Sequence, residues 1–231
     1  VFLAGIHGNE KAGVTALKPM FNVFTEADIS GTVFGILGNI KALENNQRYL
    51  EEDLNRLWTS EQLQNRMHKV NLNSEEREQK ELLVILNSII ATNSGPFYFI
   101  DFHTTSSKTL PFITINDALI NRKFSKQFPV PIVLGIEEYL EGPLLSYINA
   151  LGYVSLGFES GQHEDKDAVL NCTSFIFLAL VFSNAIDNKK EKEYIKHYTQ
   201  LKSQSKNLDK IFEIIYLYRI QEEEVFKMKQ G

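Results

Sequence analysis

The sequence predicts an α/β domain built on a largely parallel sheet. Short apolar segments that suit buried strands alternate along the chain with segments of helical length and spacing. The strand segments are apolar almost throughout, which is typical of strands that helices cover on both faces. This alternation therefore favours a sheet with a helical layer on each side.

The first third of the chain begins with two strands and a helix. Residues 1–6 and 32–38 are short apolar runs, each containing or ending at glycine. Residues 11–24 between them have helical spacing, and Pro19 makes that helix short or kinked. Residues 39–58 are polar and rich in turn residues, which predicts a long loop of the kind that often carries function.

Residues 73–93 form the clearest helical segment. Asn73 or Ser74 can cap it, and acidic residues occupy its first turn. Its buried stripe is expected to consist of Leu82, Ile85, Leu86 and Ile89. The apolar run 97–102 that follows is a predicted strand.

The remaining elements continue the alternation. Strands are expected at 112–116, 131–135 and 153–159, with helices at 117–128 and 142–151. The apolar stretch 168–182 is shorter than the roughly 20 residues of a membrane span and contains polar residues. We therefore interpret it as part of a buried helix over 168–186.

Composition changes sharply after this helix, which indicates a domain boundary. Residues 189–210 are a Lys-rich polar connector or exposed helix, and 211–231 are rich in β-branched and aromatic residues. These last residues are too few to complete a sheet, so we expect a β-rich domain that begins at 211 and is cut off. Val1 lies inside an apolar run, so the natural N-terminus is also expected to be missing.

Bulk composition narrows the classes of function. The chain of 231 residues is 43% hydrophobic, enough for a sizeable core, and its formal charge is −5. No basic cluster interleaved with aromatic residues is present, which argues against nucleic acid as a partner. The single cysteine, Cys172, cannot form an internal disulfide. Together with the lack of a visible signal peptide, this favours a cytoplasmic location.

The first candidate functional motif is His7-Gly8-Asn9-Glu10. A His and a Glu three residues apart often occur by chance, and an ordinary polar turn is the alternative interpretation. Their position strengthens the functional interpretation, because both follow an apolar strand, where open α/β sheets bind their ligands.

The second motif, "DFHTT" at 101–105, places His103 at the exit of another apolar strand. A catalytic zinc site has three protein ligands and one open coordination position, and His7, Glu10 and His103 would provide these three ligands. A histidine that is only hydrogen-bonded at a strand end is the alternative for His103.

The third motif, "RYLEEDLNR" at 48–56, lies in the long polar segment. Arg48 and Arg56 offer planar donor groups for carboxylate or carbonyl oxygens, and Asn55 adds an amide. Asp53 could accept the free ring N–H of a metal-bound imidazole. The alternative is a solvated charged loop.

The fourth candidate is Glu159, which follows the apolar strand 153–159 in "LGFESGQH". A carboxylate at the end of a sheet is costly unless it is paired or functional, and beside a metal-bound water it would be a general base. His68, His163 and His197 have no partner in the pattern, and we interpret them as surface or loop residues.

These motifs, taken in order, resemble the succinylglutamate desuccinylase/aspartoacylase family, whose members are relatives of the zinc carboxypeptidases. The resemblance rests on "HGNE", "ILGNIKALENNQRYLEEDLNRLW", "DFHTT" and Glu159, and extends from Val1 to about Gln162. It implies a three-layer, zinc carboxypeptidase-like catalytic domain with a mixed, largely parallel sheet over residues 1–188. It also implies that 211–231 begin the family's C-terminal β domain.

The resemblance further implies a role for each candidate residue. Arg48 would polarise the scissile carbonyl, Glu159 would activate the attacking water, and Asp53 would orient His7. Asn55 and Arg56 would hold the α-carboxylate of the substrate. One zinc ion per chain would be bound by His7, Glu10 and His103.

We therefore predict a zinc-dependent amidohydrolase that cleaves an N-acyl amino acid. A metallocarboxypeptidase acting on short peptides and a non-catalytic metal- or ligand-binding module are the alternatives. Aspartoacylase-like members use a further Arg shortly before the catalytic Glu, whereas residues 146–159 contain no Arg or Lys, which argues against an aspartate-type substrate. The expected partner is a small-molecule substrate, and neither nucleic acid nor a membrane is expected. Assembly into a homo-oligomer is possible.

Overall fold

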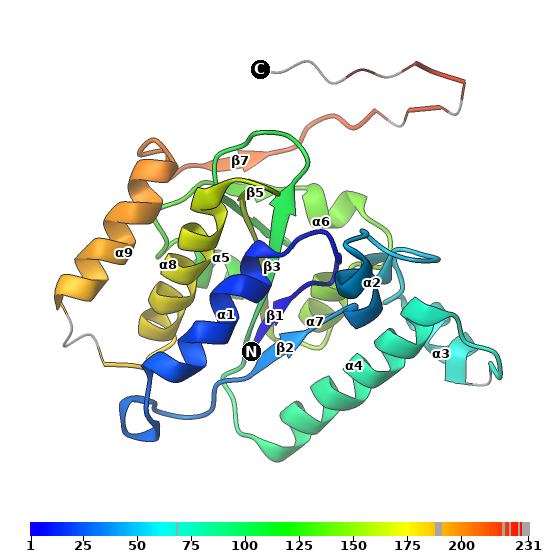
Figure 1. The fold of residues 1–231 in the computed structure, drawn as a ribbon, viewed down its shortest axis with the longest axis horizontal. Coiled ribbons are helices and arrows are strands. Elements are labelled where there is room, and N and C mark those ends of the chain that lie inside the picture. The colour runs from blue at the N-terminus through cyan, green and yellow to red at the C-terminus, as the bar shows by residue number, and fades with distance from the viewer. Residues whose placement is uncertain (68, 188–190, 219, 222, 226, 228–231) are drawn as a thin grey trace.

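A mixed sheet forms the centre of the computed structural model, which describes residues 1–231 except 68, 188–190, 219, 222, 226 and 228–231 (Figure 1). Among these residues the strands lie in the order β2-β1-β3-β6-β4-β5-β7. Their bounds are β1 (Phe2–Ala4), β2 (Gly35–Leu37), β3 (Tyr98–Thr105), β4 (Phe112–Ile115), β5 (Ile132–Leu134), β6 (Val154–Gln162) and β7 (Ile211–Glu213).

Helices connect most of these strands. Their bounds are α1 (Ala12–Val23), α2 (Ile40–Asn45), α3 (Ser60–Met67), α4 (Ser74–Thr92), α5 (Leu119–Ser125), α6 (Ile136–Tyr139), α7 (Leu144–Ala150), α8 (Lys166–Phe182) and α9 (Glu191–Gln204), with the 3-10 turns η1 (Glu26–Asp28) and η2 (Leu54–Arg56).

The sheet consists of two parallel sets of strands. β1 pairs in parallel with β2 and β3, and β3 pairs in parallel with β6. β4 is antiparallel to β6 and begins the second parallel set, β4, β5 and β7. The predicted mixed, largely parallel sheet is thus confirmed. The carboxyl ends of β1, β3 and β6 meet at one edge of the sheet as a result.

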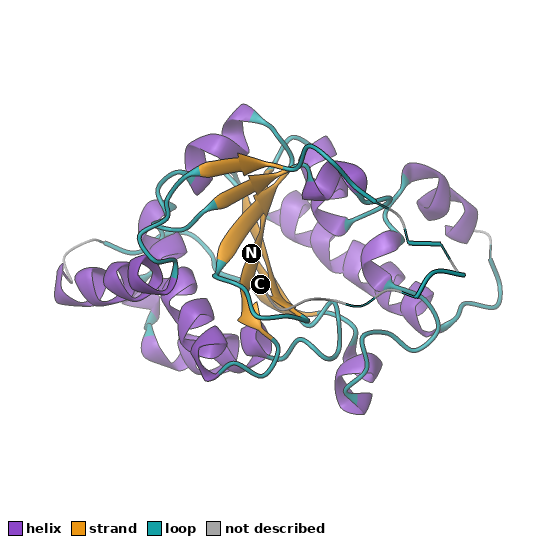
Figure 2. Ribbon diagram, turned by 90° about the horizontal axis from the view of Figure 1, so that it is seen from above, coloured by secondary structure: helices purple, strands orange, loops and turns teal. Residues whose placement is uncertain are grey.

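Helices cover both faces of the sheet, as Figure 2 shows from above. On one face α1 and α8 enclose an aromatic core in which the rings of Phe158 and Phe175 stack 4.0 Å apart between centroids. On the other face α4 and α7 pack through Leu86 and Ile148 against Leu3 and Phe99. Alternate residues of each buried strand point to these two cores, so the strands are apolar on both faces.

Two strands extend further than their apolar runs suggest. β3 continues through His103 to Thr105, and β6 continues through Glu159 to Gln162, with His103 opposite Glu159 in the parallel register. The predicted strands 97–102 and 153–159 are therefore each three residues too short at their carboxyl ends. Strand pairing continues there despite the polar side chains, and it holds His103 and Glu159 on a rigid support.

The predicted loop 39–58 is likewise partly helical. Asn39 caps α2 through a hydrogen bond from Ala42 N to its side chain, and Asp53 accepts from Asn55 N at the start of η2. Asn46, with φ 53°, ends α2 in the left-handed conformation. Capping residues thus fold this polar segment into two short turns.

α4 is the helix that its sequence predicts, with one correction. Asn73 is its N-cap and forms a capping box with Glu76. Ile85, however, is 43% exposed, whereas Leu82, Leu86 and Ile89 are buried. These three residues follow the i, i+4, i+7 pattern, and the contact with the sheet is too narrow to include Ile85.

The C-terminal part of the described chain continues this domain. The predicted polar connector forms α9, which packs on α8 and buries Leu201 and His197. β7 then joins the sheet beside β5, so residues 211–213 extend this sheet. The predicted domain limits at 188 and 210, and a β domain beyond them, stay a prediction.

The apolar helix α8 lies inside the domain, as its length and polar residues predict. It runs for 17 residues from the N-cap Asp165, and most of its side chains are buried. Among the described helices, none combines the length and the hydropathy that crossing a bilayer requires.

Candidate active site

His7, Glu10 and His103 come together at the carboxyl ends of β1 and β3. Each offers one ligand atom, these atoms lie within 4.8 Å of one another, and all three side chains are buried. The parallel pairing of β1 with β3 accounts for the convergence, because it brings both strand ends to the same edge. The predicted ligand set is thus assembled by neighbouring strands.

The turn after β1 is close-packed against α2. A Cβ atom at Gly8 would lie 2.1 Å from the carbonyl carbon of Ala42, so only glycine fits there. Gly8 N donates to Arg48 O over 3.1 Å, and Glu10 N donates to His7 O. The turn therefore presents His7 and Glu10 together and holds Arg48 beside them.

Glu10 lies between the two imidazole rings. Its Oε1 is 2.9 Å from Nδ1 of His7, and its Oε2 is 3.0 Å from Nδ1 of His103. Thr104 N also donates to Oε2 over 2.9 Å. Both Nδ1 atoms thus face the centre of the cluster.

A second carboxylate lies behind each ring. Oδ1 of Asp53 is 3.0 Å from Nε2 of His7, and Oδ2 of Asp101 is 2.8 Å from Nε2 of His103. A carboxylate in this position keeps the ring proton on Nε2 and leaves a lone pair on Nδ1 for a cation. The geometry therefore suits the expected orienting role of Asp53 and adds the same role for Asp101.

Sequence reasoning missed Asp101, although the signal was present. Asp101 and His103 are two residues apart on one strand, so their side chains point to the same face. A fully buried carboxylate inside the apolar run of β3 requires a partner, and His103 is the nearest imidazole in sequence.

The charges of this cluster depend strongly on one another. Burial raises the pKa of Glu10, but hydrogen bonds and charge from His103 and His7 outweigh it and hold that pKa far below its usual value. Burial lowers the pKa of His103, while Asp101 and Glu10 raise it well above 6.5 overall. The neighbouring carboxylates Asp101 and Glu10 thus favour the protonated form of His103.

Glu159 approaches this cluster from β6. Its Oε2 is buried and has no hydrogen-bond partner in the part of the chain that the structure describes. Burial of the carboxyl, reinforced by the charges of Glu10 and Glu137, raises the pKa of Glu159 to about 7. An unpartnered carboxylate with such a pKa is suited to taking a proton from a water molecule in the site.

Glu137 on α6 is a further buried carboxylate near the site that the sequence did not reveal. Its Oε1 accepts a 2.9 Å hydrogen bond from Thr114, and burial raises its pKa. Gly157 makes room for this contact, since a Cβ there would lie 2.4 Å from Oγ1 of Thr114. The only signal was a glutamate shortly after a strand, the same signal that identified Glu159.

Arg48 reaches the cluster from the polar segment 39–58. Its Nη1 is 3.3 Å from Oε1 of Glu10, and its Nη2 is 3.1 Å from Oδ2 of Asp53. The side chain is 41% exposed. The guanidinium therefore lies at the boundary between the buried cluster and solvent, where a substrate can reach it.

Asn55 and Arg56 lie in η2 beside Asp53. Oδ1 of Asn55 accepts a 2.9 Å hydrogen bond from Leu144 N, which fixes η2 to the start of α7. Arg56 donates to Asn55 O, and no carboxylate of the described residues lies within ion-pair distance of it. Arg56 is thus a partly exposed cation that is available to an anionic ligand.

The segment that carries these residues is held in place by Glu75 of α4. Its carboxylate is fully buried and accepts hydrogen bonds from Leu50 N at 2.8 Å, Glu51 N at 3.1 Å and the side chain of Asn39 at 3.0 Å. Burial raises the pKa of Glu75, but these donors lower it overall. Glu75 therefore anchors the Arg48–Arg56 segment to the domain.

Of the histidines expected at the surface or in a loop, His197 is packed in the core instead, whereas His163 lies in a turn. His197 is buried, stacks on Phe177 at 4.5 Å and lies 3.0 Å from Oγ of Ser174, because α9 covers α8. His163 is half-buried, and its Nδ1 lies 2.7 Å from Oγ1 of Thr104, since β6 continues past Glu159. His68 lies outside the described residues.

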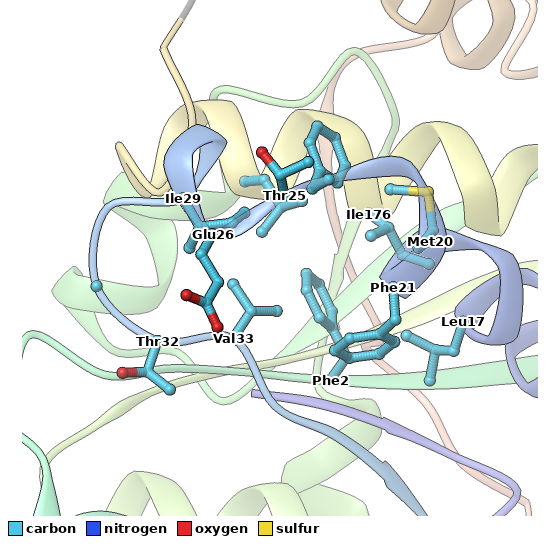
Figure 3. Close-up of a pocket in the computed structure, with 13 residues that line it drawn as sticks. Phe2, Leu17, Met20, Phe21, Thr25, Glu26, Ile29, Thr32, Val33 and Ile176 are labelled. Atoms are coloured by element: carbon cyan, nitrogen blue, oxygen red, sulfur yellow. The ribbon is translucent and has the colours of Figure 1, made fainter.

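A cavity of about 600 Å³ lies apart from this cluster, between α1, α8 and the start of β1 (Figure 3). Its walls are mainly apolar, with Leu17, Met20 and Ile176 among them, and Glu26 is the one charged residue that lines it. No candidate site residue lines this cavity. We therefore place the functional site at the His7–Glu10–His103 cluster.

Fold and site together define an α/β domain with a candidate metal centre at the carboxyl ends of parallel strands. Residues 1–166 match the model of the "Succinylglutamate desuccinylase/Aspartoacylase catalytic domain". The chain belongs to this family of deacylases, as its motifs suggest.

Curated relatives agree with this assignment. The chain is 37% identical over 108 residues to a probable aspartoacylase of Nostoc sp., a match that covers 46% of this chain and 34% of the relative. It is 32% identical over 110 residues to a succinylglutamate desuccinylase of Photorhabdus laumondii, covering 45% and 32%. The matched stretch thus spans about a third of each relative.

Solved structures share the fold. A succinylglutamate desuccinylase/aspartoacylase from Rhodobacter sphaeroides superposes with a TM-score of 0.60 at 17% identity, covering 80% of this chain and 56% of that one. The ectoine utilization protein EutE (DoeB) from Ruegeria pomeroyi, in a product-bound structure, gives a TM-score of 0.62 at 16% identity, covering 80% and 57%. At these identities the similarity shows the fold alone.

Proposed function

We propose that this chain is the catalytic part of a zinc-dependent deacylase that hydrolyses the amide bond of an N-acyl amino acid. The observation that carries the proposal is the convergence of His7, Glu10 and His103 within 4.8 Å. Family membership supports the reaction class, and the neighbouring Glu159, Arg48 and Arg56 provide the groups that such a reaction needs.

The residues fit a zinc ion. Two imidazoles and one carboxylate are ligands that zinc prefers, and three protein ligands leave a position open for water or substrate. Asp53 and Asp101 keep the ring protons away from Nδ1, which matches the carboxylate–histidine–zinc arrangement. One zinc ion per chain is therefore the cofactor that we propose.

Bound zinc would lower the pKa of a water molecule from 15.7 to about 7 and polarise the scissile carbonyl. Glu159 would accept the proton of the attacking water and later deliver it to the nitrogen of the departing amine. Its unpartnered Oε2 is the atom that we assign to this transfer.

Arg48 and Arg56 have separate tasks in this proposal. Arg48, beside Glu10, would stabilise the negative charge that develops on the carbonyl oxygen of the amide. Arg56, with the Nδ2 of Asn55, would bind the α-carboxylate and so place the amide over the cluster. Asp53 would orient His7 and position Arg48 through its contacts with both side chains.

The proposed partner is a small N-acyl amino acid, and the proposed location is the cytoplasm. The location rests on the single cysteine, because Cys172 cannot form an internal disulfide, which suits a reducing compartment.

A substrate panel tests the proposal on the zinc-loaded protein. N-acetyl, N-succinyl and N-formyl amino acids are expected to be hydrolysed. If the protein instead releases the C-terminal residue from tripeptides and leaves N-acyl amino acids intact, it is a carboxypeptidase. The variant Glu159→Gln is expected to keep its zinc and lose most turnover. A kcat close to that of the parent protein would remove Glu159 as the base.

A further inference from the structure

A small apolar pocket adjoins Arg56. Its volume is about 390 Å³, which falls within the range of about 300–1,000 Å³ that is usual for small-molecule sites. Ile136, Tyr139 and Leu140 line it from α6 and the residue after it, and Ile214 and Leu217 line it from the segment after β7. The apolar walls suit an apolar group rather than a charged one.

Among the described residues, two charged side chains line this pocket, Arg56 and Glu141. Arg56 has no ion-pair partner among the described residues, and it is the one cation that an anionic group in the pocket would meet. Glu141 would repel a second carboxylate, and residues 146–159 supply no Lys or Arg to bind one. The pocket can therefore accept one carboxylate, at Arg56, together with an apolar group.

Arg56 connects the pocket to the turn η2, whose N-cap is Asp53. Arg56 follows Asp53 by three residues, and Oδ1 of Asp53 lies 3.0 Å from Nε2 of His7. The segment after α6 is fixed to the same turn, because a Cβ at Gly142 would lie 2.6 Å from Arg56 O. A ligand held by Arg56 would thus contact the apolar walls beside the turn that carries Asp53.

We propose that this pocket binds the side chain of the amino acid that the deacylase releases, and that this side chain is apolar. The inference rests on the proposed function, in which Arg56 holds the α-carboxylate. The substrate class is therefore N-acyl derivatives of amino acids such as leucine or phenylalanine, and it excludes those of aspartate and glutamate.

Steady-state kinetics on the zinc-loaded protein tests the substrate class. The kcat/KM for N-acetyl-leucine and N-acetyl-phenylalanine is expected to exceed that for N-acetyl-aspartate and N-acetyl-glutamate by about tenfold or more. Equal values, or a preference for the acidic substrates, would overturn the proposal.

A variant pair tests the pocket itself. Leu217→Arg adds a cation to the wall and is expected to reduce the preference for leucine over aspartate by about tenfold or more. Ile215→Arg makes the same change two residues away, at a side chain that is 90% exposed and does not line the pocket, and should leave the preference unchanged. An unchanged preference in Leu217→Arg, or the same loss in both variants, would overturn the assignment.

A binding measurement gives a readout that does not depend on turnover. In the Glu159→Gln variant, calorimetry should show tighter binding of N-acetyl-leucine than of N-acetyl-aspartate, and the opposite order would overturn the inference. If the proposed deacylase function itself is wrong, peptides would be cleaved and every N-acyl amino acid would be left intact. That result would overturn the pocket assignment as well, whereas hydrolysis of N-acyl amino acids without the apolar preference would overturn the pocket assignment alone.

Discussion

The negative charge of ionised Glu159 should destabilise the folded, metal-free protein. The substitution Glu159→Gln removes this charge and should therefore stabilise the protein at pH values where Glu159 is ionised. The folded-state pKa of Glu159 is about 7, against 4.5 for an ordinary glutamate. At about 1.4 kcal/mol for each pKa unit, this difference corresponds to at most about 3 kcal/mol. The amide of glutamine fills the same space and carries no charge at any pH.

The direction follows from which state binds the proton. Below pH 4.5 both the folded and the unfolded chain hold the proton of Glu159, and its ionisation costs nothing. As the pH rises from 4.5 to about 7, the unfolded chain releases this proton first, so stability falls. Above about pH 7 the loss is complete. Relative to the parent protein, Glu159→Gln should therefore gain stability as the pH rises.

Denaturant unfolding in the presence of a chelator measures this effect. The free energy of unfolding of Glu159→Gln, minus that of the parent, should increase by about 3 kcal/mol between pH 4.5 and about pH 8. Glu44→Gln, at an exposed position of α2, is the matched control and should stay within about 0.5 kcal/mol of the parent at both pH values. A change below about 1 kcal/mol in Glu159→Gln, or one of opposite sign, would refute the reasoning.

Three further substitutions test the surroundings of the cluster. Asp101→Asn should weaken zinc binding about 10- to 100-fold in a chelator competition, because its amide no longer fixes the ring proton of His103; an unchanged affinity would contradict this. Glu75→Gln should raise KM while zinc content stays constant, since the anchor of the Arg48–Arg56 segment is weakened, and an unaltered KM would argue against that anchor. Arg48→Ala should lower kcat about 100- to 1,000-fold with zinc retained, and a loss below about tenfold would exclude oxyanion stabilisation.

Much of the candidate site could be predicted because its parts follow recognisable strands. His7 and Glu10 follow the apolar run of β1, and His103 and Glu159 end the apolar runs of β3 and β6. Parallel strands bring their carboxyl ends to one edge, so the positions of these four residues after strands, together with the family resemblance, indicated that they lie close together.

The parts that were missed depend on contacts between distant segments. The strand register that continues through His103 and Glu159 is set by pairing across 56 residues of sequence, which no local pattern reports. Burial of His197 requires α9 to pack on α8, and the Lys-rich composition of that segment indicated exposure instead. Glu137 lies in a helix of four residues, too short to leave a periodic pattern.

The polar segment 39–58 shows that composition alone does not predict short helical turns. Its composition indicated a loop, but the capping residues Asn39 and Asp53 start short helical turns within it. Short turns of this kind depend on single side chains rather than on a repeated pattern. The candidate residues of the segment were selected by their chemistry, and their roles stay a prediction.

The central claim is that His7, Glu10 and His103 hold one zinc ion, and metal content tests it most directly. Elemental analysis after exhaustive dialysis should find one zinc per chain in the parent protein and in Glu159→Gln, and almost none in His103→Ala, with circular dichroism confirming that each variant is folded. A folded His103→Ala that retains one zinc per chain would contradict the account.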